Sequence, residues 1–568
     1  MANEFRHADP GSSLSKDEYR ATNAHYADGE TTGDSLVFDG SLWKRNPAGT
    51  PLADDTYYLG SASKRWKGIY APIYPVESSA VIIASDAPAG LRAYAAILRA
   101  QGLPVYVLDG AADQSEINTA RAALSGKAKI TIIGPTVNIS DAISAARSDT
   151  TWHFINCRIV CVTDNLALMF GSGSAVTGVE VILENTVFDG DDKALFGVDF
   201  EGNPSQVTFK GTLAVRNCKR GNVYLRYLTK LNFDVINVTG QAAPSSYNQG
   251  VLLLNSSNIN GRAIITKDCG NYIDPSIYVS QRIHTNYNVQ IDNLYSDSLL
   301  IPTILIVNMH DFQLGKIYIN GNLTPEAYIE AATPDGLDFY GVSYNGTVGE
   351  IVANNHFCSG VVFGDNNWEI SNISVGQIVA GGCGNRGVVL SHNNSDTHNV
   401  QVGSIIVFNN GQKGAAPHGM SMADTSDLQV GQIIAYDDQD TPTQTYPLAF
   451  ETSNNRALER IRFGLCNFDG CPTKTPKYNV SADAYGNNYP FVNSGTATVA
   501  NGQTTIVVAH ALGKAPTRVY VTPTNSMGNA AKFWVDTIGA TEFTINVDAD
   551  PGATTAIFNW RAVIGDGH

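Results

Sequence analysis

The chain has 568 residues, of which 43% are hydrophobic and only 16% are charged, and its formal net charge is −16. This negative charge argues against electrostatic binding to nucleic acid or to an anionic membrane surface, and no apolar stretch is long enough to span a bilayer. The eight cysteines are too scattered for a disulfide framework or a zinc site, so buried free thiols are expected. The 53 glycines, with abundant Asn, Ser and Thr, favour many short strands joined by tight turns.

The first 75 residues are polar and rich in turn-forming residues, and they begin without an apolar signal region, so we expect no export by that route. Apolar and polar residues alternate around Asp39 and Gly40, which predicts a β-hairpin. From Tyr58 to Ala71 the sequence follows the pattern LGS…RW…Y. This segment resembles a module common in bacteriophage tail fibres and tailspikes; a small hairpin with a buried Trp66 is the alternative.

Residues 76–150 alternate between strand and helix patterns. Buried strands are predicted at 81–84, 105–108 and 129–133, and helices after Pro88 and Asp113. The stretch from Asp109 to Ser140 resembles the beginning of pectin-lyase-like right-handed β-helices in phage proteins, in which a helix covers the open end. A solenoid needs such a cap because its terminal coil exposes core and strand edges.

The region from about 151 to 485 is repetitive. Four copies of a Val-Gly-x-Ile motif begin at Val348, Val375, Val402 and Val430, at spacings of 27, 27 and 28 residues. A period of this length indicates a stacked architecture. Because each copy is a short β run with no helix-length amphipathic stretch between copies, the pattern disfavours helical and leucine-rich repeats. It predicts an all-β right-handed parallel β-helix of about ten coils.

Residues 490–568 break the repeat. Four strand patterns separated by Gly, Pro and Asn turns predict a small antiparallel β-sandwich. The stretch from Asn501 through His510 to Trp560 resembles the C-terminal β-sandwich modules of phage tail fibres and tailspikes. Three segments of the chain therefore resemble one class of protein, the viral tailspike or tail fibre.

This resemblance implies an organisation and a set of partners. Residues 1–75 would attach to the phage tail or baseplate, 76–150 would form the α/β cap, 151–485 the β-helix, and 490–568 a receptor-binding or trimerisation sandwich. The family is usually homotrimeric, is assembled in the host cytoplasm as part of the virion tail, and binds a host-surface polysaccharide. It implies no cofactor and no metal.

A β-helix places equivalent residues of successive coils about 4.8 Å apart in columns. Apolar residues one and three positions after Gly336, Gly360, Gly387 and Gly419 are expected to face inward. The position before each glycine holds Asp335, Ser359, Arg386 and His418, and another column should align Asp365, His392 and Asp424. A column of carboxylates and an imidazole could perform acid–base chemistry on a sugar; a structural stack of polar turn residues is the alternative.

Two short segments resemble polygalacturonase motifs. Asp335 and Asp338 lie in Thr-Pro-Asp-Gly-Leu-Asp, and His418 begins His-Gly-Met-Ser, although Pro417 replaces the expected glycine. The candidates for acid, base or nucleophile are Asp335, Asp338, Asp365, His392, Asp424 and His418. The candidates for sugar binding are Tyr340, Tyr344, Trp368, Arg386 and Tyr436. The acidic run Asp189–Asp192, with Asp199 and Glu201, could bind a cation or a sugar or could simply form a turn.

The sequence thus predicts a viral tailspike that binds a host-surface polysaccharide and cleaves it by hydrolysis or by elimination, with a glycoside hydrolase favoured over a lyase. The separation of its two carboxylates would set the stereochemistry of hydrolysis. Two alternatives remain open: a tail fibre that binds receptor glycans without cleaving them, and a structural component of the virion.

Overall fold

The computed structural model describes short strands within residues 1–78 and most of the chain beyond them. The described residues beyond 78 are 79–145, 147–171, 177–219, 221–240, 249–269, 281–284, 286–297, 304–321, 323, 335–364, 369–391, 396–414, 417–451, 460–473, 477–478, 491–510, 512 and 515–564.

The chain divides into two units, Met1–Pro75 and Val76–His568. In the first unit, β1 (Phe5–His7) pairs antiparallel with β2 (His25–Ala27). The predicted hairpin around Asp39 is present, since β3 (Ser35–Phe38) pairs antiparallel with β4 (Trp43–Asn46) and with β5 (Tyr57–Tyr58). The remainder of the Tyr58–Ala71 segment lies outside the described residues.

The second unit begins with the predicted alternation of strands and helices. Its elements are β6 (Ser79–Ile83), α1 (Ala89–Ala100), β7 (Val105–Val107), α2 (Gln114–Ala123) and β8 (Ala128–Ile133). Polar side chains at α2 accept hydrogen bonds from backbone N–H groups of the first coil, in the pairs Asp113 with Asn138 (2.7 Å), Gln114 with Ser140 (2.9 Å) and Asn118 with Ser144 (2.9 Å). These side chains replace the partners that a preceding coil would provide, and so cap the open edge.

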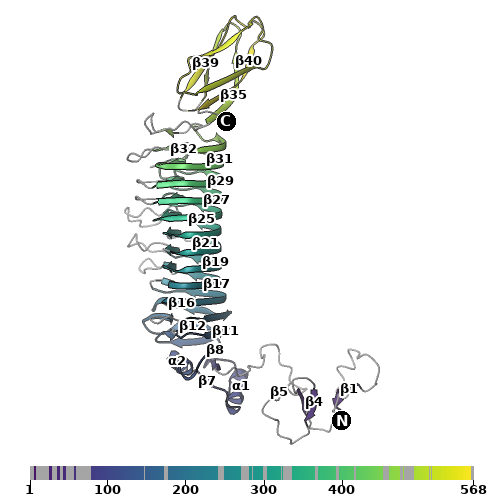
Figure 1. The fold of residues 1–568 in the computed structure, drawn as a ribbon, viewed down its shortest axis with the longest axis vertical. Helices are drawn as coiled ribbons and strands as arrows, with labels where there is room; N and C mark the ends of the chain where they lie inside the picture. Colours follow the sequence, from purple (N-terminus) through teal and green to yellow (C-terminus); the bar gives the residue numbers. More distant parts are fainter. Residues whose placement is uncertain are drawn as a thin grey trace. The chain divides into compact units, whose positions relative to one another are not determined.

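Beyond the cap, each coil pairs in parallel with the next, and the strands form the three long sheets of a parallel β-helix (Figure 1). Sheet I contains β8, β11 (Thr150–Ile155) and β14 (Val179–Glu184), and sheet II contains β9 (Thr136–Ile139), β12 (Arg158–Cys161) and β15 (Val187–Asp189). Later strands are long enough to bend from sheet I into sheet II: β16 (Ala194–Arg216), β17 (Gly221–Thr239), β19 (Ser257–Lys267), β21 (Tyr287–Asp297), β23 (His310–Asn320), β25 (Ser343–Asn354), β27 (Glu369–Gly381), β29 (Asp396–Phe408), β31 (Thr425–Tyr436) and β33 (Arg462–Gly470).

Sheet III completes each coil. β16 and β17 also pair within it at their N-terminal ends. Its other strands are β10 (Ile143–Ser144), β13 (Asn165–Gly171), β18 (Gln249–Leu254), β20 (Gln281–His284), β22 (Ile304–Val307), β24 (Leu337–Tyr340), β26 (Val361–Phe363), β28 (Arg386–Leu390), β30 (His418–Met422), β32 (Tyr446–Phe450) and β34 (Lys477–Tyr478). The predicted fold class is therefore confirmed.

The glycine of the Val-Gly-x-Ile repeat lies where a strand bends from sheet I into sheet II. A Cβ at Gly376 would lie 2.3 Å from the carbonyl oxygen of Gly349, and a Cβ at Gly403 would lie 2.3 Å from that of Gly376. Each bend thus packs against the bend of the preceding coil, with no space for a side chain. The repeat is a steric requirement of stacking.

The interior is built from the predicted columns. Leu337, Phe339, Val361 and Phe363 are fully buried, and so are their equivalents Val388, Leu390, Met420 and Met422. The rings of Phe339 and Phe363 stack with centroids 4.7 Å apart. Among the described residues, all eight cysteines are free thiols, and all but the partly buried Cys466 are buried, as expected.

The outward-pointing positions of sheet III are less open than their alternation suggests. Val362, Val389 and Ser421, which point away from the interior, are nevertheless buried. This part of sheet III is therefore not a freely exposed surface. In the described part of the chain, no helix is long and apolar enough to cross a membrane.

The C-terminal strands form two antiparallel three-stranded sheets. One contains β35 (Phe491–Val499), β40 (Ala556–Ile564) and β37 (Arg518–Pro523), and the other contains β36 (Thr505–Ala509), β39 (Glu542–Val547) and β38 (Phe533–Asp536). Phe543 from one sheet meets Trp560 from the other edge-to-face, with ring centroids 5.5 Å apart. This is the predicted sandwich arrangement.

Candidate functional site

Two predicted site residues, Arg386 and His418, are direct neighbours in sheet III. They begin β28 and β30 and are paired in the parallel register. Both contact Glu451, which directly follows β32: Arg386 donates to its carboxylate at 3.0 Å, and His418 Nε2 lies 3.4 Å from Glu451 Oε1. We call these three residues the Arg–His–Glu cluster.

The Arg–His–Glu cluster crosses the width of sheet III. Arg386 and His418 begin their strands, whereas Glu451 follows the end of its strand, so the contact spans the positions between them. In these positions lie the paired residues Val389, Ser421 and Ala449, all of them buried. The contact between Arg386 and Glu451 thus runs past a buried column that contains the small side chains of Ser421 and Ala449.

Glu451 is held as a carboxylate. Burial alone would raise its pKa, but the hydrogen bond from His418 and the charge of Arg386 outweigh burial and lower the pKa to about 2. The His418 side chain is only 2% exposed, against 17% for Arg386 and 21% for Glu451. The carboxylate is therefore ionised at neutral pH and partly accessible.

The cluster also contains polar atoms with unused hydrogen-bonding capacity. Among the described residues, His418 Nδ1 and Arg386 Nε are buried and have no hydrogen-bond partner, and the same holds for Ser421 Oγ in the column beneath. Buried polar groups are normally paired, and exceptions concentrate at functional sites. Buried donors and acceptors of this kind can be satisfied by an ordered water.

The other predicted catalytic residues do not join this cluster. The Asp335 carboxylate accepts a hydrogen bond from the Ser359 backbone N–H at 2.8 Å. Asp335 lies in the same column as His418 but three coils away, which is roughly 14 Å at ~4.8 Å per coil. Asp338 lies between Leu305 and Val362 in the register of sheet III. Asp424 is buried just beyond β30, with a left-handed backbone (φ 41°).

Several predictions fall outside what the structure describes. Asp365, His392 and Trp368 are outside the described residues, and of Tyr340 only its place at the end of β24 is described. The predicted Asp365–His392–Asp424 column therefore stays a prediction.

Two predicted sugar-binding tyrosines lie in aromatic columns. Tyr344 meets His310 edge-to-face at 4.1 Å, and His310 stacks on Tyr287 at 4.8 Å. Burial lowers the pKa of His310. Tyr436 stacks on Phe408 with centroids 5.4 Å apart. Each of these tyrosines therefore already contacts an aromatic ring of the preceding coil, which leaves less of its surface for a pyranose.

The acidic run at Asp189 is neutralised within the fold. The buried Asp189 carboxylate accepts hydrogen bonds from Arg158 (2.8 Å) and Arg216 (2.7 Å), and Asp199 accepts a bidentate pair from Arg226 at 3.0 Å. Burial opposes ionisation of Asp189, but its hydrogen bonds, that from Arg216 foremost, lower its pKa overall. Asp189 and Asp199 therefore tie successive coils together and offer little to a cation.

Another group of carboxylates, Asp109, Asp113 and Glu116, has oxygens within 4.8 Å of one another. Asp113 is already used, because it accepts hydrogen bonds from the N–H groups of Gly110 and Asn138 and so anchors α2 to the first coil. This arrangement serves the cap rather than an ion.

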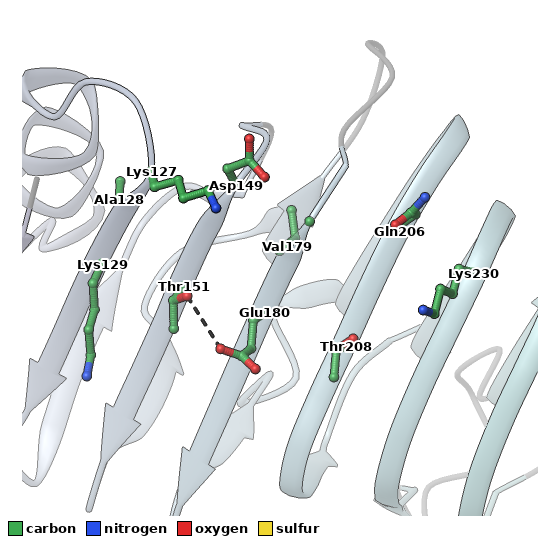
Figure 2. Close-up of a pocket in the computed structure, with 11 residues that line it drawn as sticks. Lys127, Ala128, Lys129, Asp149, Thr151, Val179, Glu180, Gln206, Thr208 and Lys230 are labelled. Carbon is green, nitrogen blue, oxygen red and sulfur yellow. Dashed lines mark hydrogen bonds between the residues drawn. The ribbon is translucent and has the colours of Figure 1, made fainter.

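An open hollow of about 480 Å³, which no sequence pattern predicts, lies on the outside of sheet I. Figure 2 shows its lining, which combines ammonium, hydroxyl, amide and carboxylate groups: Lys127, Lys129, Asp149, Thr151, Glu180, Gln206, Thr208 and Lys230. Gly178 also lines the hollow, and a Cβ there would lie 2.7 Å from an Asp149 carboxylate oxygen.

The lysines of this hollow are available to a ligand. Lys210 pairs with Glu180, but Lys127, Lys129 and Lys230 have no acidic partner within ion-pair distance among the described residues. Three lysines without a direct ion pair thus line a polar depression that also contains the carboxylates of Asp149 and Glu180. Hydroxyl and ammonium groups together suit a saccharide that carries acidic groups.

No protein-family model matches the chain, and no curated protein matches it. Among solved structures, it is similar to the tailspike protein gp49 from Pseudomonas phage LKA1, at 10% identity and a TM-score of 0.42 over 80% of this chain and 92% of that one. A second is the A-module of the Azotobacter vinelandii mannuronan C-5 epimerase AlgE4, at 12% identity and a TM-score of 0.38 over 67% and 96%. A third is a mutant tailspike of E. coli bacteriophage HK620 in complex with a pentasaccharide, at 10% identity and a TM-score of 0.39 over 79% and 89%. Likeness at these values transfers no activity, and the β-helix is established by its own strand pairing.

Proposed function

We propose that the chain is a viral tailspike that binds a host-surface polysaccharide and cleaves it by hydrolysis. The resemblance of residues 58–71 and 501–562 to tailspike modules supports the class. The observation that carries the chemistry is the Arg–His–Glu cluster: an ionised, partly accessible carboxylate held between a guanidinium and an imidazole whose second nitrogen has no partner among the described residues.

In this proposal Glu451 is the basic group of the reaction. Its carboxylate either removes a proton from the attacking water or attacks the anomeric carbon directly, and one of the other carboxyl candidates, Asp335, Asp338 or Asp424, delivers a proton to the departing glycosidic oxygen. The buried His418 orients the Glu451 carboxylate. Arg386 positions Glu451 and keeps it ionised. Hydrolysis breaks the bond between the anomeric carbon and the glycosidic oxygen, and the elements of water are added across it.

Binding and assembly complete the proposal. The hollow on sheet I binds acidic groups of the polysaccharide, residues 1–75 attach the chain to the phage tail, and copies of the chain associate as a homotrimer. Asp335, Asp338 and Asp424 remain candidates for further contacts with the sugar, together with Asp365 and His392.

The test uses purified full-length protein and the capsule or O-antigen of the host. Newly formed reducing ends without unsaturated products indicate hydrolysis, and Glu451→Gln should lower the rate at least a hundredfold. Asp427→Asn, which alters an exposed ion pair with Arg460, is the control and should leave the rate unchanged.

Three outcomes would overturn parts of this proposal. Full cleavage by both Glu451→Gln and His418→Gln would remove the Arg–His–Glu cluster from the mechanism. Adsorption to host cells without cleavage would show a binding-only fibre, and an absence of adsorption would show a structural virion component.

A further inference from the structure

A continuous column of apolar side chains runs along the outside of sheet II. The register of the parallel strands places one outward residue from each of seven successive coils in this column. We call it the sheet II stripe; its residues are Ile265, Tyr295, Tyr318, Val352, Val379, Ile406 and Ile434. Six steps of ~4.8 Å make it roughly 29 Å long.

The sheet II stripe is set off from its surroundings. The column ends at polar residues, with Asn237 before Ile265 and Asn467 after Ile434. Its members are half-buried by their neighbours, and Tyr295 is 37% exposed. Four of them occupy the fifth position of the Val-Gly-x-Ile repeat, a position that the interior does not use.

Strand propensity alone does not account for these residues. The corresponding outward column of sheet I, on many of the same strands, is polar in every coil: Ser79, Lys129, Thr151, Glu180, Thr208, Asn232, Asn260, Gln290, Gln313, Thr347, Ser374, Gln401, Gln429 and Arg462. Strand formation favours β-branched and aromatic residues equally in both columns, so it does not explain why only one of them is apolar. Contiguous apolar surface with polar borders marks an interaction site.

We propose that the sheet II stripe is the face along which copies of this chain associate side by side, parallel and in register. The stripe has the spacing of the coils themselves, so the partner that matches it best is another solenoid with the same rise. A second copy at the same height presents its own apolar ridge to this one, coil against coil. A partner with any other repeat would lose this match within a few coils.

The charges beside the sheet II stripe fit a second copy. Next to Val379, Ile406 and Ile434, the flanking outward residues are uncharged, on one side Gln377, Ser404 and Gln432 and on the other Gly381, Phe408 and Tyr436. Identical copies in register therefore meet no like charges over these coils. Nearer the N-terminus, Lys316 pairs with Glu350 of the next coil at 2.8 Å, so each copy neutralises these two charges within itself.

This inference rests on the part of the proposed function in which copies associate, and it adds the face that they use. Ile406→Cys should form a disulfide between copies under mild oxidation, because an in-register partner brings residue 406 against residue 406. Gln401→Cys lies on the same strand but faces outward on sheet I, and it should not cross-link. Denaturing gels without reductant give the readout.

A second measurement uses the mass of the protein in solution. The wild type should exceed the 60.8 kDa monomer, and Val379→Lys with Ile406→Lys should lower its mass to that of the monomer. Ser374→Lys with Gln401→Lys, at the sheet I positions of the same two strands, should leave the mass unchanged. A monomeric wild type would overturn both the association and this face. An associated wild type in which Ile406→Cys fails to cross-link would overturn the face alone.

Discussion

Arg386 and Glu451 are 65 residues apart in the chain, yet Arg386 donates a hydrogen bond to the Glu451 carboxylate at 3.0 Å. Both side chains are less than a quarter exposed. The pair ties the end of β32 to the start of β28, two coils away, and a charge left alone in this position would be poorly solvated. The pair is therefore structural as well as electrostatic.

Arg386→Ala should lower the free energy of unfolding by about 3 kcal/mol, because it leaves the Glu451 carboxylate largely buried without its main counter-charge. Denaturant unfolding of the full chain measures this. The control is Arg460→Ala, which breaks a more exposed pair with Asp427 and should cost about 0.2–1 kcal/mol. Equal losses in the two variants would contradict the proposed burial of the cluster.

The lowered pKa of Glu451 predicts that the free energy of unfolding depends on pH. Its pKa is about 2 in the folded protein and 4.5 ordinarily, so its stabilisation is complete above pH 4.5 and is lost as the pH falls toward 2. The loss is on the order of 3 kcal/mol. Glu451→Gln lacks this dependence, so the stability gap between wild type and variant should narrow over that interval. Unfolding midpoints measured from pH 6 to 2 test this, and a constant gap would argue against it.

The solenoid could be predicted because its requirements recur in every coil. Val348, Val375, Val402 and Val430 are paired one coil apart, as their spacing indicated. Where the strands of successive coils pair without a shift in register, aligning one column of residues also aligns its neighbours. The inward positions and the Arg386–His418 pairing could therefore be predicted as well. The burial of the outward positions of sheet III was less predictable. The alternation of residues predicts which side chains point outward, but not which other side chains cover them.

Glu451 and the hollow left no repeated signal. The positions equivalent to Glu451 in the preceding coils hold Ala423, Ser391 and Gly364. No column of acidic residues therefore marks Glu451 as a site residue in the sequence. Its contact depends on a long arginine side chain crossing a sheet. The hollow is lined by residues of coils that precede the clear repeats. Both are products of tertiary packing.

Because of His356, the free energy of unfolding should decrease as the pH is lowered from 6.5 to 4. Burial of its ring lowers its pKa to about 4, so below pH 6.5 the unfolded chain takes up a proton that the folded chain refuses. The loss is on the order of 3 kcal/mol. His356→Gln should flatten this part of the profile, whereas His398→Gln, at a partly exposed position, should keep it. Parallel profiles for wild type and His356→Gln would refute this origin.

The hollow on sheet I should bind acidic polysaccharide in a salt-dependent way. Lys129→Gln with Lys230→Gln should weaken binding about tenfold at low salt, at about 0.7 kcal/mol for each lysine. The matched control is Lys316→Gln, an outward lysine of sheet II. Binding is measured with an acidic polysaccharide immobilised at two salt concentrations. A loss of the same size for the control, or none for the double variant, would remove the hollow from the binding surface.

Gly376→Ala tests the steric origin of the repeat. Its new methyl group would lie 2.3 Å from the Gly349 carbonyl oxygen, and the backbone of two coils would have to separate to accept it. Overpacking of this kind typically costs about 1–3 kcal/mol, and the loss of two neighbouring coil contacts places the expected cost at the upper end. Gly90→Ala, in α1, has open space around its Cβ and should cause no loss, since alanine favours a helix. Denaturant midpoints of the two variants decide the matter. If Gly376→Ala were as stable as the wild type, the glycine column would not be a requirement of coil stacking.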